Sequence, residues 1–202
     1  MNEKKLKCIL IDYLMDTYPT ALLIGVEVPF ISMKRRVDVL LITQEKQLIA
    51  FEIKSDQDTL RRLNDQITDY KKTFDKLFIV TSDKYKDICQ SIPKTIGCLY
   101  CNDNNIKVIR EASIVKRLSK HNLSFFLQRK DFQKIGYTQD APILELRKKL
   151  VNSRSIQSLH SLAIISILDR YSERYALFKR YKEHKTTLQD LDYLTKPFDL
   201  LL

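Results

Sequence analysis

The spacing of apolar residues changes along the chain and predicts a succession of elements. Residues 4–18 repeat apolar positions every three or four residues, which favours one helix that ends before Pro19. Three apolar runs follow, at 21–30, 35–42 and 47–54. They are short, rich in Val, Ile, Leu and Phe, and apolar on both faces, which predicts strands of a sheet covered on both sides.

The rest of the first half continues the alternation of helix and strand. Asp58 is placed to cap a helix over about 59–74, and the run KLFIVTS predicts a further strand. A short helix around 85–90 and two weaker strands, GCLYC and NIKVIRE, complete it, with NDNN as their turn. The predicted order is α-β-β-β-α-β with a final hairpin, which is a mixed α/β (α+β) sheet.

From residue 112 onward the pattern becomes helical. Helices are expected within 113–120, 123–135, 142–150 and 155–185. We therefore predict two regions, a core over 1–111 and a helical extension over 112–202. The turn formers from Gly136 to Pro142 mark the best boundary between helical patterns.

Composition agrees with an ordinary globular chain. Its 202 residues are 44% hydrophobic and 30% charged, enough for a real core. The longest apolar runs are far too short for a membrane span, and no signal peptide is apparent, so we expect a cytoplasmic protein. The four cysteines form neither a disulfide framework nor a full metal set, since Cys98 and Cys101 make a lone C-x-x-C pair.

Positive charge gathers in the second half. The net charge is +10, and residues 113–202 hold 17 Lys and Arg against 9 Asp and Glu. Such an excess favours a polyanion such as nucleic acid, although a solvated basic helix surface would look the same.

Two predicted strands carry charged residues where apolar ones are expected. A hairpin centred on Glu45 would place Asp38 directly opposite Glu52, with Lys54 on the same face. Adjacent carboxylates resist ionisation unless a cation lies between them, and Mg²⁺ or Mn²⁺ would suit such oxygens. The lysine would then orient a water molecule and neutralise charge on a phosphate.

Two alternatives stay open at this point. A structural salt bridge joining Asp38 or Glu52 to Arg36 or Lys54 would satisfy the same charges. A hairpin shifted by one residue would move the two acids to opposite faces.

These residues resemble the PD-(D/E)XK nuclease superfamily, which has the restriction-endonuclease-like fold. The resemblance covers about residues 3–110 and rests on Asp38, then Glu52-x-Lys54, within the predicted α-β-β-β-α-β order. The segment EIKSDQDTLRRLNDQITDY, followed by FDKLFIVTS, is similar to a little-characterised bacterial branch with E-I-K-S and Q-x-x-x-Y motifs.

The resemblance implies roles for particular residues. Asp38, Glu52 and the carbonyl of Ile53 would hold Mg²⁺ or Mn²⁺, and Lys54 would activate the attacking water. Glu27 would tune the site, while Gln66 and Tyr70 would contact the substrate backbone or the lysine. Tyr70 also shares an apolar stripe with its helix neighbours, which would equally make it a core residue.

The resemblance thus implies a metal-dependent deoxyribonuclease, expected to be an endonuclease of phage defence, mobile-element or repair origin. The alternative is a non-catalytic nucleic-acid-binding or adaptor protein that kept the fold. No membrane partner is expected, and a homodimer would suit cutting of both DNA strands. Basic residues expected to contact nucleic acid are Arg61, Arg62, Arg170, Arg174, Lys179, Arg180 and Lys182.

Overall fold

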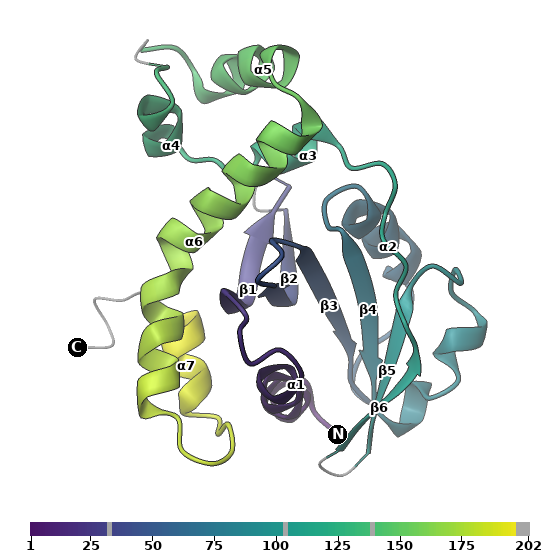
Figure 1. The fold of residues 1–202 in the computed structure, drawn as a ribbon. Helices are drawn as coiled ribbons and strands as arrows, with labels where there is room; N and C mark the ends of the chain where they lie inside the picture. Colours follow the sequence, from purple (N-terminus) through teal and green to yellow (C-terminus); the bar gives the residue numbers. More distant parts are fainter. Residues whose placement is uncertain (32–33, 103–104, 138–139, 197–202) are drawn as a thin grey trace.

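A six-stranded mixed sheet forms the centre of the molecule (Figure 1). The computed structural model describes residues 1–31, 34–102, 105–137 and 140–196. Its strands are β1 (Leu23–Phe30), β2 (Arg35–Ile42), β3 (Leu48–Lys54), β4 (Lys76–Thr81), β5 (Gly97–Asn102) and β6 (Asn105–Arg110), arranged in that order across the sheet. Neighbours are antiparallel except in the pairs β3–β4 and β4–β5, which are parallel. The mixed α/β fold predicted from the sequence is confirmed.

Helices pack against the apolar faces of the sheet. They are α1 (Glu3–Thr17), α2 (Leu63–Lys71), α3 (Lys120–Ser124), α4 (Arg129–Lys134), α5 (Ile143–Ser153), α6 (Ile156–Tyr181) and α7 (Asp190–Thr195). α1 packs against β2, β3 and β6, α2 against β4, and α6 and α7 against β1. All seven residues of β3 are buried, as expected for a central strand covered on both faces.

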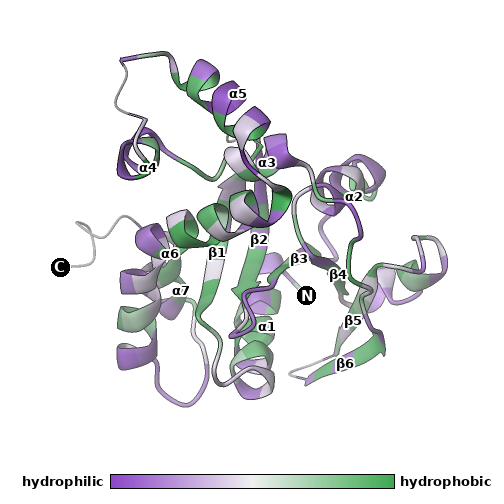
Figure 2. Cartoon of the chain, turned by 45° about the horizontal axis from the view of Figure 1, so that its top comes forward, coloured by the Kyte–Doolittle hydropathy of each residue, from purple (hydrophilic) through white to green (hydrophobic). Residues whose placement is uncertain are grey.

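The long helix α6 connects the extension to the core. Hydrophobic and hydrophilic bands alternate along it, as expected for a helix with one buried face (Figure 2). One hydrophobic cluster contains residues of the sheet together with residues of α5, α6 and α7. The two regions divided at residue 111 therefore share a core, and the division itself stays a prediction. In the part of the chain that is described, no helix is both long and apolar enough to cross a membrane.

The hairpin register follows the prediction. β2 and β3 pair Val39 with Phe51 and Ile42 with Leu48, which is the register of a turn centred on Glu45. The alternative register shifted by one residue is therefore excluded for these strands.

Several predicted helices are wrong in extent. Asp58 does not cap α2, which begins only at Leu63; its carboxylate instead accepts hydrogen bonds from the backbone and hydroxyl of Ser55, 2.8 and 2.6 Å away. The helix expected near residue 85 is two short 3-10 turns, η1 (Asp83–Tyr85) and η2 (Ile88–Gln90). The single helix expected over 123–135 is divided between α3 and α4, while α7 lies beyond the helices predicted.

Residues 113–119 form no helix, contrary to the sequence pattern. The N–H groups of Ser113, Val115 and Ser119 donate to carbonyls of Thr95, Asp75 and Lys72, respectively. These partners lie far away in sequence, so tertiary hydrogen bonds replace the local bonds that a helix would have supplied.

The cysteine prediction also needs correction, because Cys89 and Cys98 form a disulfide. Folding of the segment after β4 brings their Cα atoms to 6.1 Å, within the range for such a bond. Cys8 and Cys101 are buried free thiols. The predicted turn residues Asp103 and Asn104, and part of the boundary at 136–142, lie outside the described residues.

Candidate active site

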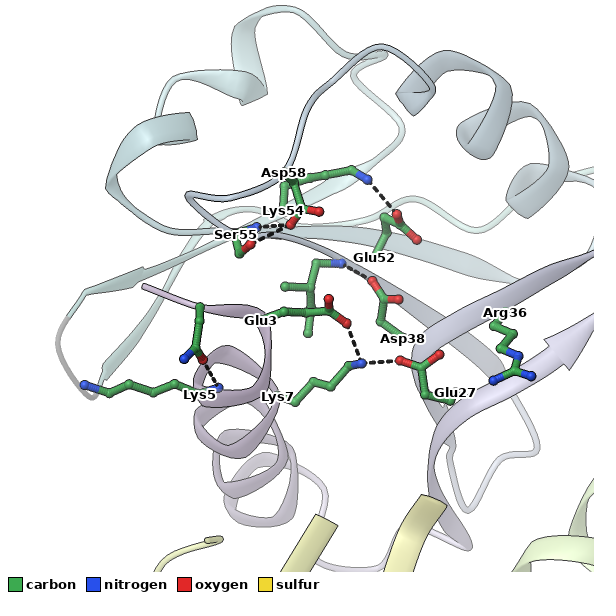
Figure 3. A network of polar contacts seen from close by, with 12 residues as sticks. Glu3, Lys5, Lys7, Glu27, Arg36, Asp38, Glu52, Lys54, Ser55 and Asp58 are labelled. Atoms are coloured by element: carbon green, nitrogen blue, oxygen red, sulfur yellow. Dashed lines mark hydrogen bonds and ion pairs between the residues drawn. The ribbon is translucent and has the colours of Figure 1, made fainter. Parts of the chain in front are cut away.

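The charged residues of the first three strands meet where β2 and β3 separate. The pairing of these strands ends at Val39 and Phe51. One residue further, the Oδ2 atom of Asp38 accepts a hydrogen bond of 2.6 Å from the backbone N–H of Ile53 (Figure 3). The side chain of Asp38, rather than the backbone of β2, thus accepts the hydrogen bond from this N–H of β3. The bond fixes the carboxylate against β3.

Glu27 reaches the same place from β1 through an unusual backbone. Its φ is +53°, in the left-handed region that residues other than glycine seldom adopt. Its neighbours Val26 and Val28 keep their normal pairing with β2, so the irregularity is confined to this residue. Backbone strain of this kind is often retained where it aims a functional side chain.

One half of the site is built around Glu52. Its Oε1 atom accepts hydrogen bonds from Lys54, at 2.8 Å, and from the Gln66 amide, while Oε2 accepts one of 2.5 Å from the Tyr70 hydroxyl. Gln66 also accepts a bond of 3.0 Å from Lys54. Glu52, Lys54 and Tyr70 are almost wholly buried, so this is a closed network of satisfied groups.

The other half is built around Lys7 of α1, which sequence reasoning missed. Its ammonium donates to Glu3, at 2.5 Å, and to Glu27. Carboxylate oxygens of Glu3, Glu27 and Asp38 all lie within 4.8 Å of one another. Figure 3 shows Asp38 between the two halves, with Lys7 on one side and Glu52 on the other.

A signal for Lys7 was present in the sequence. Lys7 precedes Leu10, Ile11 and Leu14 by three, four and seven residues, which puts it on the buried stripe of α1. Lysine on such a stripe is unusual because its charge needs a partner. Glu3, one turn earlier, is within reach of the same face.

Among the described residues, Asp38 belongs to no ion pair, although the charge of Lys7 acts on it. Burial, together with repulsion from Glu52, raises the pKa of Asp38 well above its usual range. Burial opposes the charge on Lys7, but its bonds to the two glutamates and the charge of Asp38 outweigh this, so its pKa is raised. Burial and the charge of Glu52 also raise the pKa of Tyr70 well above its usual value, which keeps it a hydrogen-bond donor.

These carboxylates have the chemistry that a hard divalent cation requires. Asp38 and Glu27 present oxygens from adjacent strands, and Glu3 adds a third from α1. Among the described residues, Glu3, Glu27 and Asp38 are the acidic side chains that lie close enough together to share one ion. Glu52 does not belong to this group. The predicted ligand pair of Asp38 and Glu52 stays a prediction, because both oxygens of Glu52 already accept hydrogen bonds from Lys54, Gln66 and Tyr70.

The other predicted roles have mixed outcomes. All six predicted catalytic residues, Glu27, Asp38, Glu52, Lys54, Gln66 and Tyr70, lie in this network. Gln66 contacts Lys54 as expected. Tyr70 donates a hydrogen bond to Glu52 and is only 1% exposed, so its side chain does not reach the accessible surface. The alternative of a salt bridge between Glu52 and Lys54 is also present, at 2.8 Å. Ile53 contacts Asp38 through its N–H, and nothing in the structure tests its carbonyl as a ligand.

The predicted nucleic-acid contacts do not form one stripe. Arg61 and Arg62 are exposed just before α2, whereas the others belong to α6 and its end. Arg170 donates to the carbonyls of Ser166 and Phe126, and Lys182 pairs with Asp12 at 3.1 Å, so both are used within the fold. The exposed side chains of Lys179 and Arg180 lie over the rings of Tyr175 and Tyr181, and Arg174 over Tyr171.

Comparison with known proteins places nearly all of the chain in one family. A family model described as bacteriophage P4 protein cII matches residues 1–195. The chain belongs to the bacteriophage P4 cII family. Protein cII of Enterobacteria phage P4 is 26% identical over 210 residues, covering 97% of this chain and 78% of the phage protein.

The cII match includes the sheet as well as the helical extension, so both regions belong to the family. Among solved structures, a protein of unknown function from Silicibacter pomeroyi is similar with a TM-score of 0.42 and 15% identity. That likeness covers 77% of this chain and 85% of the other. These descriptions name no activity.

Proposed function

We propose that this member of the cII family is a metal-dependent nuclease that hydrolyses phosphodiester bonds in DNA. The observation that carries the proposal is the position of Asp38. Its carboxylate is fixed between a buried Glu52–Lys54 pair and two further carboxylates at the point where two central strands part. A purely structural acid would normally be paired with a cation, and Asp38 instead has a raised pKa.

Mg²⁺ or Mn²⁺ would be held by Asp38 with Glu27, and by Glu3 or Glu52 if their present bonds are exchanged. Bound there, such an ion would supply a water of lowered pKa and positive charge beside a phosphate. The protein's own part is positional. Asp38 is held by the Ile53 N–H, which prevents the carboxylate from turning away.

The ammonium of Lys54 would donate a hydrogen bond to the phosphate. Its ammonium is held by Glu52 and Gln66 in a buried position, so it is ordered before any substrate arrives. A fixed point charge at this place would stabilise negative charge that grows on a phosphate oxygen. Tyr70 in turn holds Glu52, which keeps the lysine in place.

A specific observation favours a second candidate. Both oxygens of Glu52 and the ammonium of Lys54 are engaged within the protein, as they would be in a structural network. A non-catalytic nucleic-acid-binding or adaptor protein on the same fold would need nothing more. In that case, binding would depend on salt and on basic residues, and no strand would be cut.

The decisive experiment is cleavage of supercoiled plasmid and end-labelled single strands with Mg²⁺, Mn²⁺ or EDTA. Asp38→Asn and Lys54→Met are compared with wild type, and exposed Lys4→Met is the matched control. The nuclease proposal expects metal-dependent cutting that both site variants lose and the control keeps. DNA binding without cutting by the wild type would favour the second candidate.

The phage relative supports a mobile-element setting inside a bacterial host, and we place the protein in the cytoplasm. The Cys89–Cys98 disulfide makes this testable, since a reducing compartment keeps most thiols free. If the protein works in that compartment, the pair should be reduced in the cell, and alkylation in denaturant at the moment of lysis should label both cysteines; the disulfide would then form only outside the cell. Protection of the pair from alkylation would count against this compartment.

A further inference from the structure

A pocket separate from the candidate active site is lined by four arginines. Its volume is about 580 Å³, within the range of small-molecule sites. It opens where α3, α4, α5 and the middle of α6 gather at one end of the molecule (Figure 1). The charged and aromatic residues of its lining are Arg129, Arg147, Arg170, Arg174, Phe125 and Tyr171.

Two of these guanidinium groups are held inside the protein by neutral partners. Arg147 is 9% exposed and donates to the carbonyls of Ser124, at 3.2 Å, and Leu127, at 2.9 Å. Arg170 donates to the carbonyls of Ser166, at 3.0 Å, and Phe126, at 2.8 Å. Each of these hydrogen bonds satisfies N–H groups of a guanidinium, but the carbonyl acceptors carry no negative charge that would balance the arginine.

The four positive charges have no carboxylate partner. Within the described residues, none of the four arginines forms an ion pair. The carboxylate of Asp131 acts on Arg170 from a distance, but it already accepts hydrogen bonds from the Gln128 N–H and the Ser166 hydroxyl. Arginine stays charged in proteins, so this concentration of charge is unfavourable until an anion enters.

The aromatic residues indicate what the anion is attached to. The guanidinium of Arg147 lies 5.0 Å from the Phe125 ring centre, and those of Arg170 and Arg174 lie 5.5 and 5.6 Å from that of Tyr171. Planar guanidinium and aromatic groups are the surfaces on which nucleic acid bases stack. A bare phosphate would fill only a small part of the pocket, whereas a nucleotide brings both the charge and a planar base.

We propose that this pocket binds a nucleotide, with its phosphate among the arginines and its base against Phe125 or Tyr171. The proposal does not rest on the proposed nuclease activity, because binding here would stand without any cleavage. The pocket also reaches β1, where Pro29 and Phe30 line it two and three residues beyond Glu27. At about 3.3 Å per strand residue, its edge is about 7 Å along the strand from the acidic site.

The test is calorimetric titration of the full chain with dAMP, deoxyadenosine and inorganic phosphate as separate probes. We expect dAMP to bind at least tenfold more tightly than either of its parts. Arg174→Gln should weaken dAMP binding about tenfold, and it should leave the fold intact because, among the described residues, this side chain makes a ring contact with Tyr171 and no ion pair. Arg129→Gln is the second variant, and exposed Arg154→Gln outside the pocket is the matched control.

A further comparison distinguishes two sources of the nucleotide, the end of a nucleic acid strand and a free nucleotide. Tighter binding of a 5′-phosphorylated oligonucleotide than of dAMP would assign the pocket to a strand end, and equal binding would assign it to free nucleotides. Either result supports the site. Absence of dAMP binding at millimolar concentration, or equal weakening by Arg154→Gln and the two pocket variants, would overturn it.

Discussion

The substitution Asp38→Asn should make the protein more stable while removing its proposed metal site. Asparagine keeps the shape of the side chain and an oxygen that accepts from the Ile53 N–H. It removes the charge that burial and Glu52 disfavour, as the raised pKa of Asp38 shows. Stability and function should therefore change in opposite directions at this position.

The effect of Asp38→Asn on the free energy of unfolding depends on pH. In the unfolded chain the carboxyl ionises near pH 3.9, so below that value Asp38 is protonated in both states and carries no penalty. As the pH rises, the unfolded chain ionises first, and the folded protein loses stability until its own raised pKa is passed. The advantage of Asp38→Asn should thus be absent near pH 4 and present at neutral pH.

The magnitude follows from the charges that face Asp38. Opposite residues of a hairpin are about 5 Å apart, and at an effective dielectric constant near 20 two charges there repel by about 3 kcal/mol. Attraction by Lys7 and partial exposure of Asp38 reduce this. We expect a net gain of about 1–2 kcal/mol, or roughly 2–8 °C in a chain of this size.

The assay is urea unfolding in EDTA at pH 4 and pH 7.5, with exposed Asp87→Asn as the matched control. Mg²⁺ is then added at pH 7.5. At one hundred times its dissociation constant it should stabilise the wild type by about 2.7 kcal/mol and leave Asp38→Asn unchanged. A variant less stable than wild type at pH 7.5, or equal stabilisation of both proteins by Mg²⁺, would refute the reasoning.

Three further predictions concern the supports of the site and the fold. Tyr70→Phe removes a buried hydrogen bond to Glu52 and should lower the free energy of unfolding by about 1.5–3 kcal/mol in urea titrations; an unchanged midpoint would contradict this. Gly97→Ala would place a Cβ atom 2.2 Å from the ring of Phe78, so thermal unfolding should reveal a loss of about 1–3 kcal/mol, and a neutral result would show that the ring yields freely. Asp12→Ala removes the acceptor that holds the loop between α6 and α7, and hydrogen exchange in that loop should accelerate while exchange in β3 stays unchanged; uniform acceleration would indicate global destabilisation instead.

Much of the sheet was readable from the sequence because its signals are local. The apolar runs around Val39 and Phe51 predict strands, and a turn centred on Glu45 predicts the register that the structure has. The register shifted by one residue was excluded only by the strand pairing itself. The register of the turn centred on Glu45 also made Asp38 and Glu52 neighbours. The charge on Lys54, two residues later, then had to lie on the same face.

Other features depended on partners far along the chain. Residues 113–119 have a helical pattern, yet their N–H groups find carbonyls at residues 72, 75 and 95. Lys7 and Glu3 joined the site because α1 packs against the central strands, and no local pattern states that contact. The pairing of Cys89 with Cys98 likewise depended on how the segment after β4 folds back.

The sequence by itself determined the strands and the charged residues within them, Asp38, Glu52 and Lys54, since these follow from side-chain periodicity. The structure decided between the two registers that the sequence left open for the hairpin of β2 and β3. Only the tertiary structure decided how these charges are shared. It bound Glu52 to Lys54 and Tyr70, left Asp38 outside the ion pairs of the described residues, and brought arginines of three helices around one pocket. The physical reason is that the charge state of a buried group is set by all groups packed around it, most of which are distant in sequence.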